Sequence, residues 1–481
     1  MTSPISQHSA PIAIVGAGVF GLSTALHLAR RGYTNVKVFD KQPYDETLYS
    51  YADGCDSASA DINKLIRSAY GGQKEYQDLG TEAIALWDSW NEELKSSGAS
   101  VPPGMALGDD IWINNGVLSC SDAKTLTAFD KATVDAMEAA GHHKTQLITS
   151  EFADRSIADA RGLGTAMQPF SKNIIGVLDT TGGLIKADKA CRFALHKAKS
   201  LGVRFFLDPE AGAFDSFLHG KSEKYVTGIK TADGKSHEAF MTIMACGGWT
   251  PSILPSLDGL CETTAGSVFM FKIPENSDLR ARFHHSNFPN WMFNVRSGAE
   301  GGLYGFPIDE SGVLKIGYRG TKYTNPVLQP DGIERSVPIT RWTQHEKITQ
   351  VPEQAQKVVA KFIDEYLPEL RQEGIDVWMT RLCWYTDTFD NHYVIDRVQG
   401  FEGLMCATGG SGHAFKFLPN IGDWVVDIME GVRMERPAVK AWAWRSLRDG
   451  QIPANYLMEG STGAKSLKNV TLVSRDTWSE K

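Results

Sequence analysis

The chain has 481 residues, of which 42% are hydrophobic and 22% are charged, and these proportions are typical of a globular enzyme of two or three domains. Its formal net charge of −8 argues against nucleic acid or an anionic membrane as the main partner. The seven cysteines are scattered and form no C-x-x-C pair, which excludes a disulfide framework and a zinc site. The polar first segment has no basic residue, so we expect no signal peptide and a cytoplasmic location. We also expect no bound metal.

Residues 11–40 carry the most informative pattern. An apolar strand ends at Val15, glycines follow with G-x-G-x-x-G spacing, a helical pattern runs to Arg31, and a strand over residues 36–39 ends at Asp40. A strand, a glycine turn, a helix, a strand and an acid in this order predict a βαβ unit that binds a dinucleotide. The alternative is a glycine turn between two core elements, and the pattern does not choose between NAD and FAD.

Each glycine of this turn has a physical task. Gly16 permits the tight turn, Gly18 lets the backbone approach the pyrophosphate, and Gly21 lets the helix pack close to the strand. The helix N-terminus favours an anion, and Asp40 accepts hydrogen bonds from ribose hydroxyls. Residues 11–29 hold no charged side chain, which is also typical of a membrane span, but the glycine spacing argues against a membrane span. The predicted cofactor contacts also include Val19, Phe20, Lys41 and Ser59.

Helical and strand patterns alternate after Asp40. Residues 58–71 indicate a turn into a short helix that places Lys64 and Arg67 on one face, where they either meet solvent or point at a cofactor or a carboxylate. Longer helices are predicted over residues 76–97, 122–142, 150–162, 187–201 and 357–366, and from the turn at 408–413 through 428. Strands are predicted over residues 111–118, 203–206, 225–229, 240–245, 268–271, 291–294, 302–306, 313–318, 376–385 and 403–407.

These elements predict an α/β protein with a discontinuous Rossmann-like domain and a second domain rich in antiparallel β-sheet. The dinucleotide-binding domain is predicted to comprise residues 9–98, 165–255 and 370–445. The substrate or catalytic domain is predicted to comprise residues 99–164 and 256–369. Residues 1–8 and 446–481 are polar and are predicted to be loose tails, with disorder over residues 1–10.

Five short stretches are specific in combination: residues 61–71, 304–307, 314–318, 381–388 and 409–417. In this order and spacing, and together with the N-terminal unit, they resemble the sarcosine oxidase family. That family includes monomeric sarcosine oxidase, the fructosyl amino acid oxidases (amadoriases), and pipecolate and saccharopine oxidases. The resemblance implies FAD, bound covalently through a cysteine thioether to the flavin 8α-methyl group. The matching residue is Cys383, whose thiolate can add to an electron-poor methyl group held beside it; the alternative is a buried structural cysteine.

The resemblance also implies roles for residues on the catalytic side. Lys315 matches the lysine that lies over the flavin and activates O₂, because a fixed ammonium stabilises the charge of superoxide; a lone strand lysine otherwise faces water. Lys64 stands where sarcosine oxidase has an arginine under the flavin and where the fructosyl enzymes have a lysine. Tyr304 and Tyr385 match aromatic residues of the pocket.

Substrate binding is implied for Arg67 and Lys416, which match the residues that hold the substrate carboxylate; the alternative is a structural ion pair for each. His413, with Gly412 beside it, is interpreted as positioning the cofactor, and Lys416 lies in the same stretch. Arg319, also assigned to the substrate site, departs from the family. The fructosyl enzymes have a short acidic motif just after the oxygen-activating lysine, and sarcosine oxidase has a histidine at position 319.

The expected function is an FAD-dependent oxidase of secondary amines that bear a carboxylate, such as N-methyl or N-alkyl amino acids. Hydride transfer to the flavin would give an imine, which is hydrolysed or cyclised, and O₂ would give H₂O₂. Alternatives are a fructosyl amino acid oxidase, an L-pipecolate or L-saccharopine oxidase, an NAD(P)-linked dehydrogenase and a non-catalytic flavin-binding protein. The expected partners are a small-molecule amine and O₂, and the expected state is a monomer.

Overall fold

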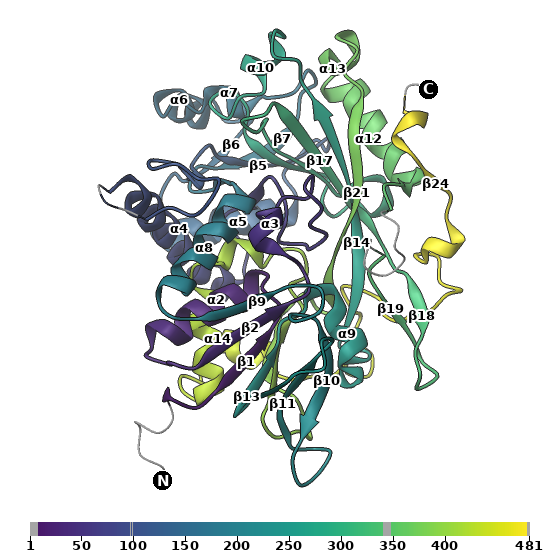
Figure 1. The fold of residues 1–481 in the computed structure, drawn as a ribbon. Helices are drawn as coiled ribbons and strands as arrows, with labels where there is room; N and C mark the ends of the chain where they lie inside the picture. The colour runs from purple at the N-terminus through teal and green to yellow at the C-terminus, as the bar shows by residue number, and fades with distance from the viewer. Residues whose placement is uncertain (1–7, 97, 99, 340–347, 479–481) are drawn as a thin grey trace.

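Two large β-sheets organise the structure, a computed structural model that describes residues 8–96, 98, 100–339 and 348–478 (Figure 1). The first sheet has six strands. Their spatial order is β22 (Val394–Arg397), β23 (Leu404–Thr408), β13 (Met241–Met244), β1 (Ile12–Val15), β2 (Val36–Asp40) and β9 (Arg204–Leu207). Neighbouring strands are parallel except for the antiparallel pair β22–β23. This is the predicted Rossmann-like sheet.

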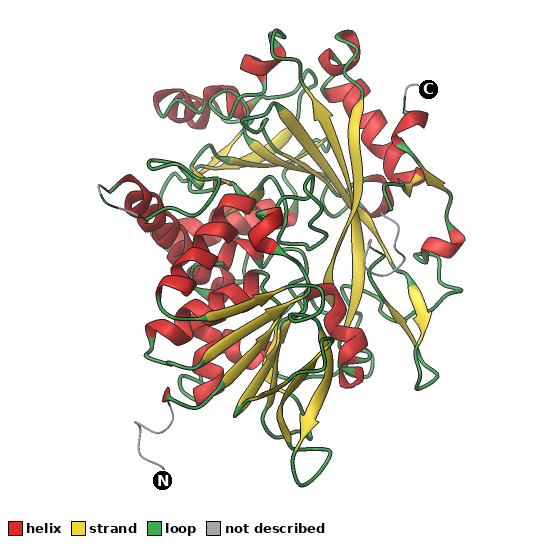
Figure 2. Ribbon diagram, in the orientation of Figure 1, coloured by secondary structure: helices red, strands yellow, loops and turns green. Residues whose placement is uncertain are grey.

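Helices α2 (Val19–Arg30), α8 (Ala187–Ser200) and α14 (Ile421–Glu430) pack together beside this sheet, and Figure 2 shows them gathered on one side of its strands. The predicted βαβ unit is confirmed as β1, α2 and β2. Gly16 has φ +107°, and a Cβ there would lie 2.2 Å from the Ala245 carbonyl oxygen. A Cβ on Gly21 would lie 1.8 Å from the Gly16 carbonyl oxygen. Only glycine permits this approach of the helix to the strand.

The second sheet has eight strands. Their order is β21 (Val377–Thr388), β14 (Cys261–Lys272), β17 (Val313–Tyr323), β16 (Leu303–Gly305), β15 (Asn290–Phe293), β5 (Val117–Ser121), β7 (Ile175–Asp179) and β6 (Gln146–Ile148). All neighbours are antiparallel except β15 and β5. Helix α12 (Glu353–Tyr366) covers it with aromatic contacts, among them Phe362 stacked on Trp291 at 4.7 Å. The predicted fold class, a parallel Rossmann-like sheet with a sheet that is largely antiparallel, is confirmed.

Smaller elements complete the described structure. The short sheets consist of β3 (Lys64–Ile66), β8 (Gly183–Ile185) and β4 (Trp112–Ile113); β10 (Phe214–His219), β11 (Val226–Thr231) and β12 (Ser236–Glu238); β18 (Pro326–Leu328) and β19 (Glu334–Ser336); and β20 (Val351–Pro352) and β24 (Leu472–Val473). The other helices are α3 (Tyr44–Thr47), α4 (Lys74–Lys95), α5 (Ala128–Ala139), α6 (Phe152–Ala160), α7 (Gly164–Met167), α9 (Thr250–Ile253), α10 (Leu279–Arg282), α13 (Glu369–Gln372) and α15 (Pro437–Trp442). In the described part of the chain no helix is long and apolar enough to cross a membrane.

Two predicted elements differ from the structure. The short helix expected within residues 58–71 is wrong, because Lys64–Ile66 forms strand β3 and pairs with β8. The strand expected over residues 111–118 is interrupted: it divides into β4 and β5, with Gly116 at φ +78° between them. In both places, pairing with a distant strand decided the local conformation. The predicted domain boundaries stay a prediction. Disorder was expected over residues 1–10; residues 1–7 fall outside the described residues, but residues 8–10 are ordered, and the His8 carbonyl oxygen accepts a hydrogen bond of 3.0 Å from the Thr34 amide.

The C-terminal segment is not a loose tail. Strand β24 pairs with β20, and Trp478 is 2% exposed, with its ring 6.0 Å from that of Phe269 and 5.6 Å from that of Phe271. The guanidinium of Arg371 lies 4.6 Å from the Trp478 ring centre. A few apolar residues in a polar stretch therefore anchor it to the eight-stranded sheet.

Replacing Trp478 with alanine is expected to lower the free energy of unfolding by about 3–5 kcal/mol, since it empties a packed site on β14. Urea denaturation measures this change. Tyr456, which is 60% exposed, provides the control: Tyr456→Ala should change the free energy of unfolding by about 0.5 kcal/mol or less. Equal losses for the two variants would contradict the anchoring role.

Candidate active site

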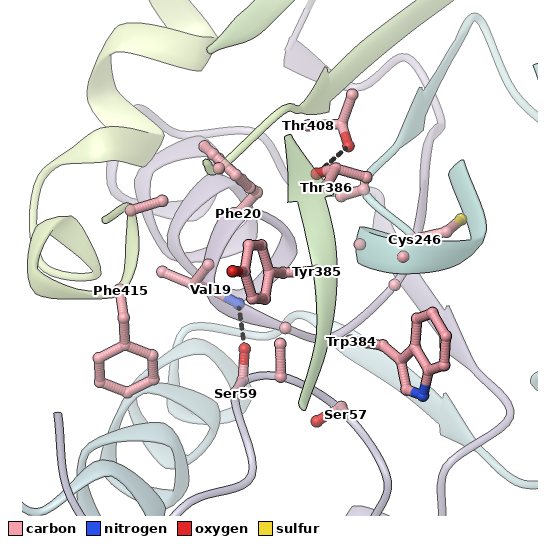
Figure 3. Close-up of a pocket in the computed structure, with 18 of the residues that line it drawn as sticks. Val19, Phe20, Ser57, Ser59, Cys246, Trp384, Tyr385, Thr386, Thr408 and Phe415 are labelled. Atoms are coloured by element: carbon pink, nitrogen blue, oxygen red, sulfur yellow. Dashed lines mark hydrogen bonds between the residues drawn. The ribbon is translucent and has the colours of Figure 1, made fainter. Parts of the chain in front are cut away.

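One cavity of about 1050 Å³ collects residues of both large sheets (Figure 3). Every predicted site residue except Gly21 lines it, and Gly21 lies beneath the glycine turn. The predicted residues in the lining are Gly16, Gly18, Val19, Phe20, Asp40, Lys41, Ser59, Lys64, Arg67, Tyr304, Lys315, Arg319, Cys383, Tyr385, Gly412, His413 and Lys416. Chain segments hundreds of residues apart therefore meet around a single space.

The glycine-turn end of the cavity is built for an anion. Ser59 Oγ accepts a hydrogen bond of 3.1 Å from the Val19 amide, and a Cβ on Gly18 would lie 3.1 Å from the same oxygen (Figure 3). The first turn of α2 contains no acidic residue. Backbone N–H groups and the positive end of the helix dipole thus face a crevice that a side chain at position 18 would narrow.

Asp40 and Lys41 stand at the end of β2. The Asp40 carboxylate accepts hydrogen bonds from the Ala17 amide at 2.7 Å and the Gln42 amide at 2.9 Å, and burial raises its pKa. The Lys41 ammonium lies 4.1 Å from the Trp249 ring centre, and burial lowers its pKa. Two carboxylate oxygens offer about four acceptor positions, so Asp40 keeps capacity for ribose hydroxyls. The volume of the whole cavity is at the upper end of the range for ligand sites, and the groups at its glycine-turn end fit a dinucleotide.

A buried charge cluster lies further along the cavity wall. Asp61 Oδ1 is 2.9 Å from Lys315 Nζ, and Asp61 Oδ2 is 2.7 Å from Lys64 Nζ. Lys315 also donates to the Asn63 carbonyl oxygen at 2.6 Å, and its ammonium lies 4.3 Å from the Phe306 ring centre. Lys315 is only 1% exposed, and burial lowers its pKa to about 8 even though Asp61 favours the charged form. Sequence reasoning gave no role to Asp61, although an acid three residues before Lys64 was its signal.

Arg67, Arg319 and Lys416, here called the cationic cluster, line the same cavity. Lys416 Nζ donates to the Tyr70 hydroxyl at 2.9 Å, and Arg319 donates to the carbonyl oxygens of Ser411 at 3.2 Å and Gly412 at 3.3 Å. Within the described residues none of the three cations forms an ion pair with a carboxylate. Burial, followed by repulsion from the two guanidinium groups, holds the pKa of Lys416 well below its usual range.

His413 is held as a neutral ring. Burial and the neighbouring Lys416 lower its pKa to about 3. Its Nε2 lies 3.0 Å from the Asn391 carbonyl oxygen, which only accepts, so the proton is assigned to Nε2. Nδ1 then accepts from the hydroxyls of Tyr393 at 3.0 Å and Tyr70 at 3.3 Å. A hydrogen-bonded chain therefore runs from Lys416 through Tyr70 to His413, and sequence reasoning identified neither tyrosine as part of it.

Cys383 and Lys315 project from the same face of the eight-stranded sheet. Cys383 pairs with Gly266 of β14, in a register with β21 that is regular from Gly266 to Met270, and Lys315 of β17 pairs with Met270 of β14. Directly opposed residues share a face, and residues four apart on a strand share a face. The sheet therefore presents a thiol and an ammonium to the cavity.

Two further features concern the lining around strand β21. Tyr385 and Trp384 extend to opposite sides of the strand, and the Tyr385 ring lies on the side of Val19 (Figure 3). Cys246 also lines the cavity, with its thiol donating to the Val15 carbonyl oxygen at 3.3 Å beside the glycine turn. Burial raises the pKa of the Cys246 thiol, which makes it a poor nucleophile.

Comparison with known proteins agrees with this geometry. The DAO family, described as FAD dependent oxidoreductase, matches residues 11–428. The L-saccharopine oxidase of Schizosaccharomyces pombe is 26% identical over 453 residues, which cover 91% of this chain and 93% of that protein. The monomeric sarcosine oxidase of Bacillus sp. (strain B-0618) is 26% identical over 420 residues, 86% of this chain and 90% of that protein.

Solved structures show the same relationship. A thermally stable mutant of fructosyl peptide oxidase matches with a TM-score of 0.77 and 26% identity, over 96% of this chain and 99% of that chain. The family match identifies FAD rather than NAD as the dinucleotide. The chain therefore belongs to the DAO family of FAD-dependent oxidoreductases, among the flavoprotein amine oxidases that resemble monomeric sarcosine oxidase.

Proposed function

We propose that the protein oxidises secondary amines that bear a carboxylate, such as N-methyl or other N-alkyl amino acids. The cationic cluster carries this proposal: Arg67, Arg319 and Lys416 meet in the cavity without a carboxylate partner among the described residues. Asp130, Asp179 and Asp387 act on the cluster without forming an ion pair with it. Positive charge is therefore in excess in the buried cavity, and an anionic ligand reduces that excess. A guanidinium fork suits a carboxylate in particular.

Bound FAD would supply the acceptor for a hydride from the carbon next to the substrate nitrogen and the route of these electrons to O₂, with an imine and hydrogen peroxide as products. The side chains of this protein have separate tasks around it. Arg67 and Lys416 bind the substrate carboxylate, and their charge lowers the pKa of the substrate amine so that it is neutral and reactive. Lys315 supplies a fixed positive charge where O₂ acquires negative charge. The imine is then hydrolysed, or a nucleophile of its own side chain closes a ring.

The test is an assay of peroxide formation with sarcosine, N-methyl aromatic amino acids, pipecolate, saccharopine and fructosyl-glycine. We expect turnover of at least one carboxylate-bearing secondary amine, and much slower turnover of the matching amines without the acid group. Absence of turnover with every secondary amine would refute the proposal. If no amine bleaches the flavin under anaerobic conditions, the protein binds flavin without catalysing amine oxidation. Gel filtration tests the proposed monomer against its mass of 52.8 kDa.

Covalent attachment of FAD through Cys383 is part of the proposal. Cys383 lines the cavity from β21, and a thiolate held beside the flavin methyl group can form the thioether. Acid-precipitated enzyme should give a yellow pellet whose flavin peptide contains Cys383, whereas Cys383→Ala should release its flavin to the supernatant. Cys246→Ala is the matched control, because Cys246 lines the same cavity and should leave the pellet yellow. A colourless pellet from the parent enzyme contradicts covalent attachment.

A substrate with a second acidic group, of the saccharopine type, is the second candidate. Arg319 favours it, because the third cation of the cluster stands where the fructosyl enzymes have an acidic motif. Its Nε is buried and has no hydrogen-bond partner among the described residues. One substrate carboxylate leaves positive charge of the cluster in excess, and a second carboxylate reduces this excess.

Arg319→Ala is expected to lower kcat/KM for a diacid amine about thirtyfold, which corresponds to about 2 kcal/mol for the loss of a charged hydrogen bond. For sarcosine, which has one carboxylate, the loss should be about threefold or less. Steady-state kinetics with both substrates measures the ratio. Equal losses for the two substrates would assign Arg319 to the architecture of the cavity rather than to recognition of a second acid.

A further inference from the structure

We propose that Asp61 is a positioning residue for the reaction with O₂, because it is the shared counter-ion that holds Lys315 at the cavity and keeps its ammonium charged. The inference rests on the proposed function for its chemical meaning, since Lys315 acts there on O₂. The arrangement itself belongs to this chain and involves three side chains: Asp61, Lys64 and Lys315.

The contacts of Asp61 are directional. Its Oδ1 contacts Lys315 Nζ at 2.9 Å and accepts from the Ile62 amide at 2.9 Å, while its Oδ2 contacts Lys64 Nζ at 2.7 Å. The side chain is 4% exposed, so little water competes for these bonds. Lys315 lies on β17 of the eight-stranded sheet, whereas Asp61 lies just before β3. The carboxylate therefore fixes the end of a long, flexible side chain from across the cavity wall.

The charge balance makes Asp61 decisive for Lys315. One carboxylate faces two ammonium groups. Burial alone would raise the pKa of Asp61, but the charges of Lys315 and Lys64 outweigh burial and hold this pKa well below its usual range. Arg381 also acts on Asp61, and Cys383 acts on Lys315. Burial raises the pKa of Tyr304, and Asp61 adds to this effect. Among the described residues, Lys315 forms an ion pair with no carboxylate other than Asp61.

Removal of Asp61 forces one of the two lysines to give up its proton. The Lys315 side chain is 1% exposed and that of Lys64 is 21% exposed, so water stabilises the charge of Lys64 better. Lys315 is therefore the group that becomes neutral. The remaining bond to the Asn63 carbonyl oxygen persists with a neutral amine and does not maintain its charge.

The first measurement is the pH titration of Lys315 in the oxidised holoenzyme, followed by the ¹³Cε resonances of labelled lysine and assigned by the signal lost in Lys315→Met. Asp61→Asn is expected to lower the pKa of Lys315 by at least one unit, and Asp61→Glu to restore it to within half a unit. Lys64→Met is expected to raise it, because the repulsion disappears while the carboxylate stays. Asp61→Asn and Lys64→Met should therefore shift the pKa of Lys315 in opposite directions. An electrostatic role predicts this difference, whereas loosened packing does not.

The second measurement is the rate of reoxidation by O₂ after anaerobic reduction with an amine. In Asp61→Asn the rate constant at pH 8.5 should fall at least fivefold, and its pH dependence should move with the titration of Lys315, while the anaerobic reduction changes less than threefold. Asp154→Asn is the matched control: Asp154 is buried and contacts Lys144 Nζ at 3.2 Å outside the cavity lining. It should change neither quantity.

The results distinguish failure of this inference from failure of the proposed function. An unchanged pKa of Lys315 in Asp61→Asn overturns the inference whatever the enzyme oxidises. A lowered pKa without slower reoxidation also overturns it, since the charge would then be irrelevant to O₂. If no amine reduces the flavin, the proposed function fails, yet the titration of Lys315 still decides whether Asp61 maintains its charge.

Discussion

Replacement of Lys315 with methionine is expected to slow the reaction of the reduced enzyme with O₂ by about a thousandfold, or about 4 kcal/mol, the effect of removing a preorganised charge stabiliser from a water-poor site. Methionine preserves the length and removes the charge. Anaerobic reduction by the amine should change less than tenfold, because the carboxylate site is intact. Stopped-flow absorbance of the flavin measures both half-reactions separately.

The same prediction has a pH dependence with a defined sign. Burial lowers the pKa of Lys315 to about 8, so its ammonium is present below that pH and lost above it. The rate constant for reoxidation should therefore fall as the pH rises through about 8, and Lys315→Met should show no such transition. Lys322→Met is the matched control, because Lys322 lies on the same strand but outside the cavity lining. A transition of the same size in Lys315→Met would assign it to another group.

Arg67→Ala is expected to lower kcat/KM for N-methyl amino acids by about a thousandfold, mostly through a higher KM. Truncating one partner of a buried charge pair costs about 2–5 kcal/mol, and the substrate carboxylate would lose its fork-shaped partner. Arg67→Lys should recover only part of the activity, because an ammonium cannot form both parallel hydrogen bonds. The measurements are steady-state kinetics and the binding of a simple carboxylate, followed by the flavin spectrum.

The decisive result is whether the loss of activity in Arg67→Ala is limited to substrates that carry a carboxylate. Secondary amines without a carboxylate should react with Arg67→Ala and the parent enzyme at rates within about threefold. Arg192→Ala controls for the removal of a buried arginine, because Arg192 is 7% exposed and contacts the Gly104 carbonyl oxygen outside the cavity lining. A similar loss for amines with and without the acid group would place Arg67 in the architecture of the cavity.

The N-terminal unit was predictable because its signal is local. Strand, glycine turn, helix and acid all lie within residues 11–40, and each glycine has a steric reason that holds in any such unit. The segment around Lys64 was not predictable in the same way. Its conformation depends on pairing with Gly183–Ile185, more than a hundred residues away, and a single sequence gives no register for such pairing.

The candidate site shows the same division. Resemblance, not spacing, singled out Lys315, Cys383 and Lys416, and the structure places all three around one cavity. Asp61 and Tyr70 received no role, since their significance comes from the groups they contact across the fold. The role of Trp478 was not evident either, because the polar composition around it suggests a free end, whereas its ring is buried against Phe269 and Phe271 of β14.

Strand β14 has a consequence for engineering this enzyme. It is the common backbone against which the neighbouring strands align Cys383 and Lys315, at Gly266 and Met270. Insertion of a single residue between these two positions reverses the inside–outside alternation and turns one of the two groups to the far face. Libraries aimed at new amines should therefore keep the number of residues from Gly266 to Met270 unchanged.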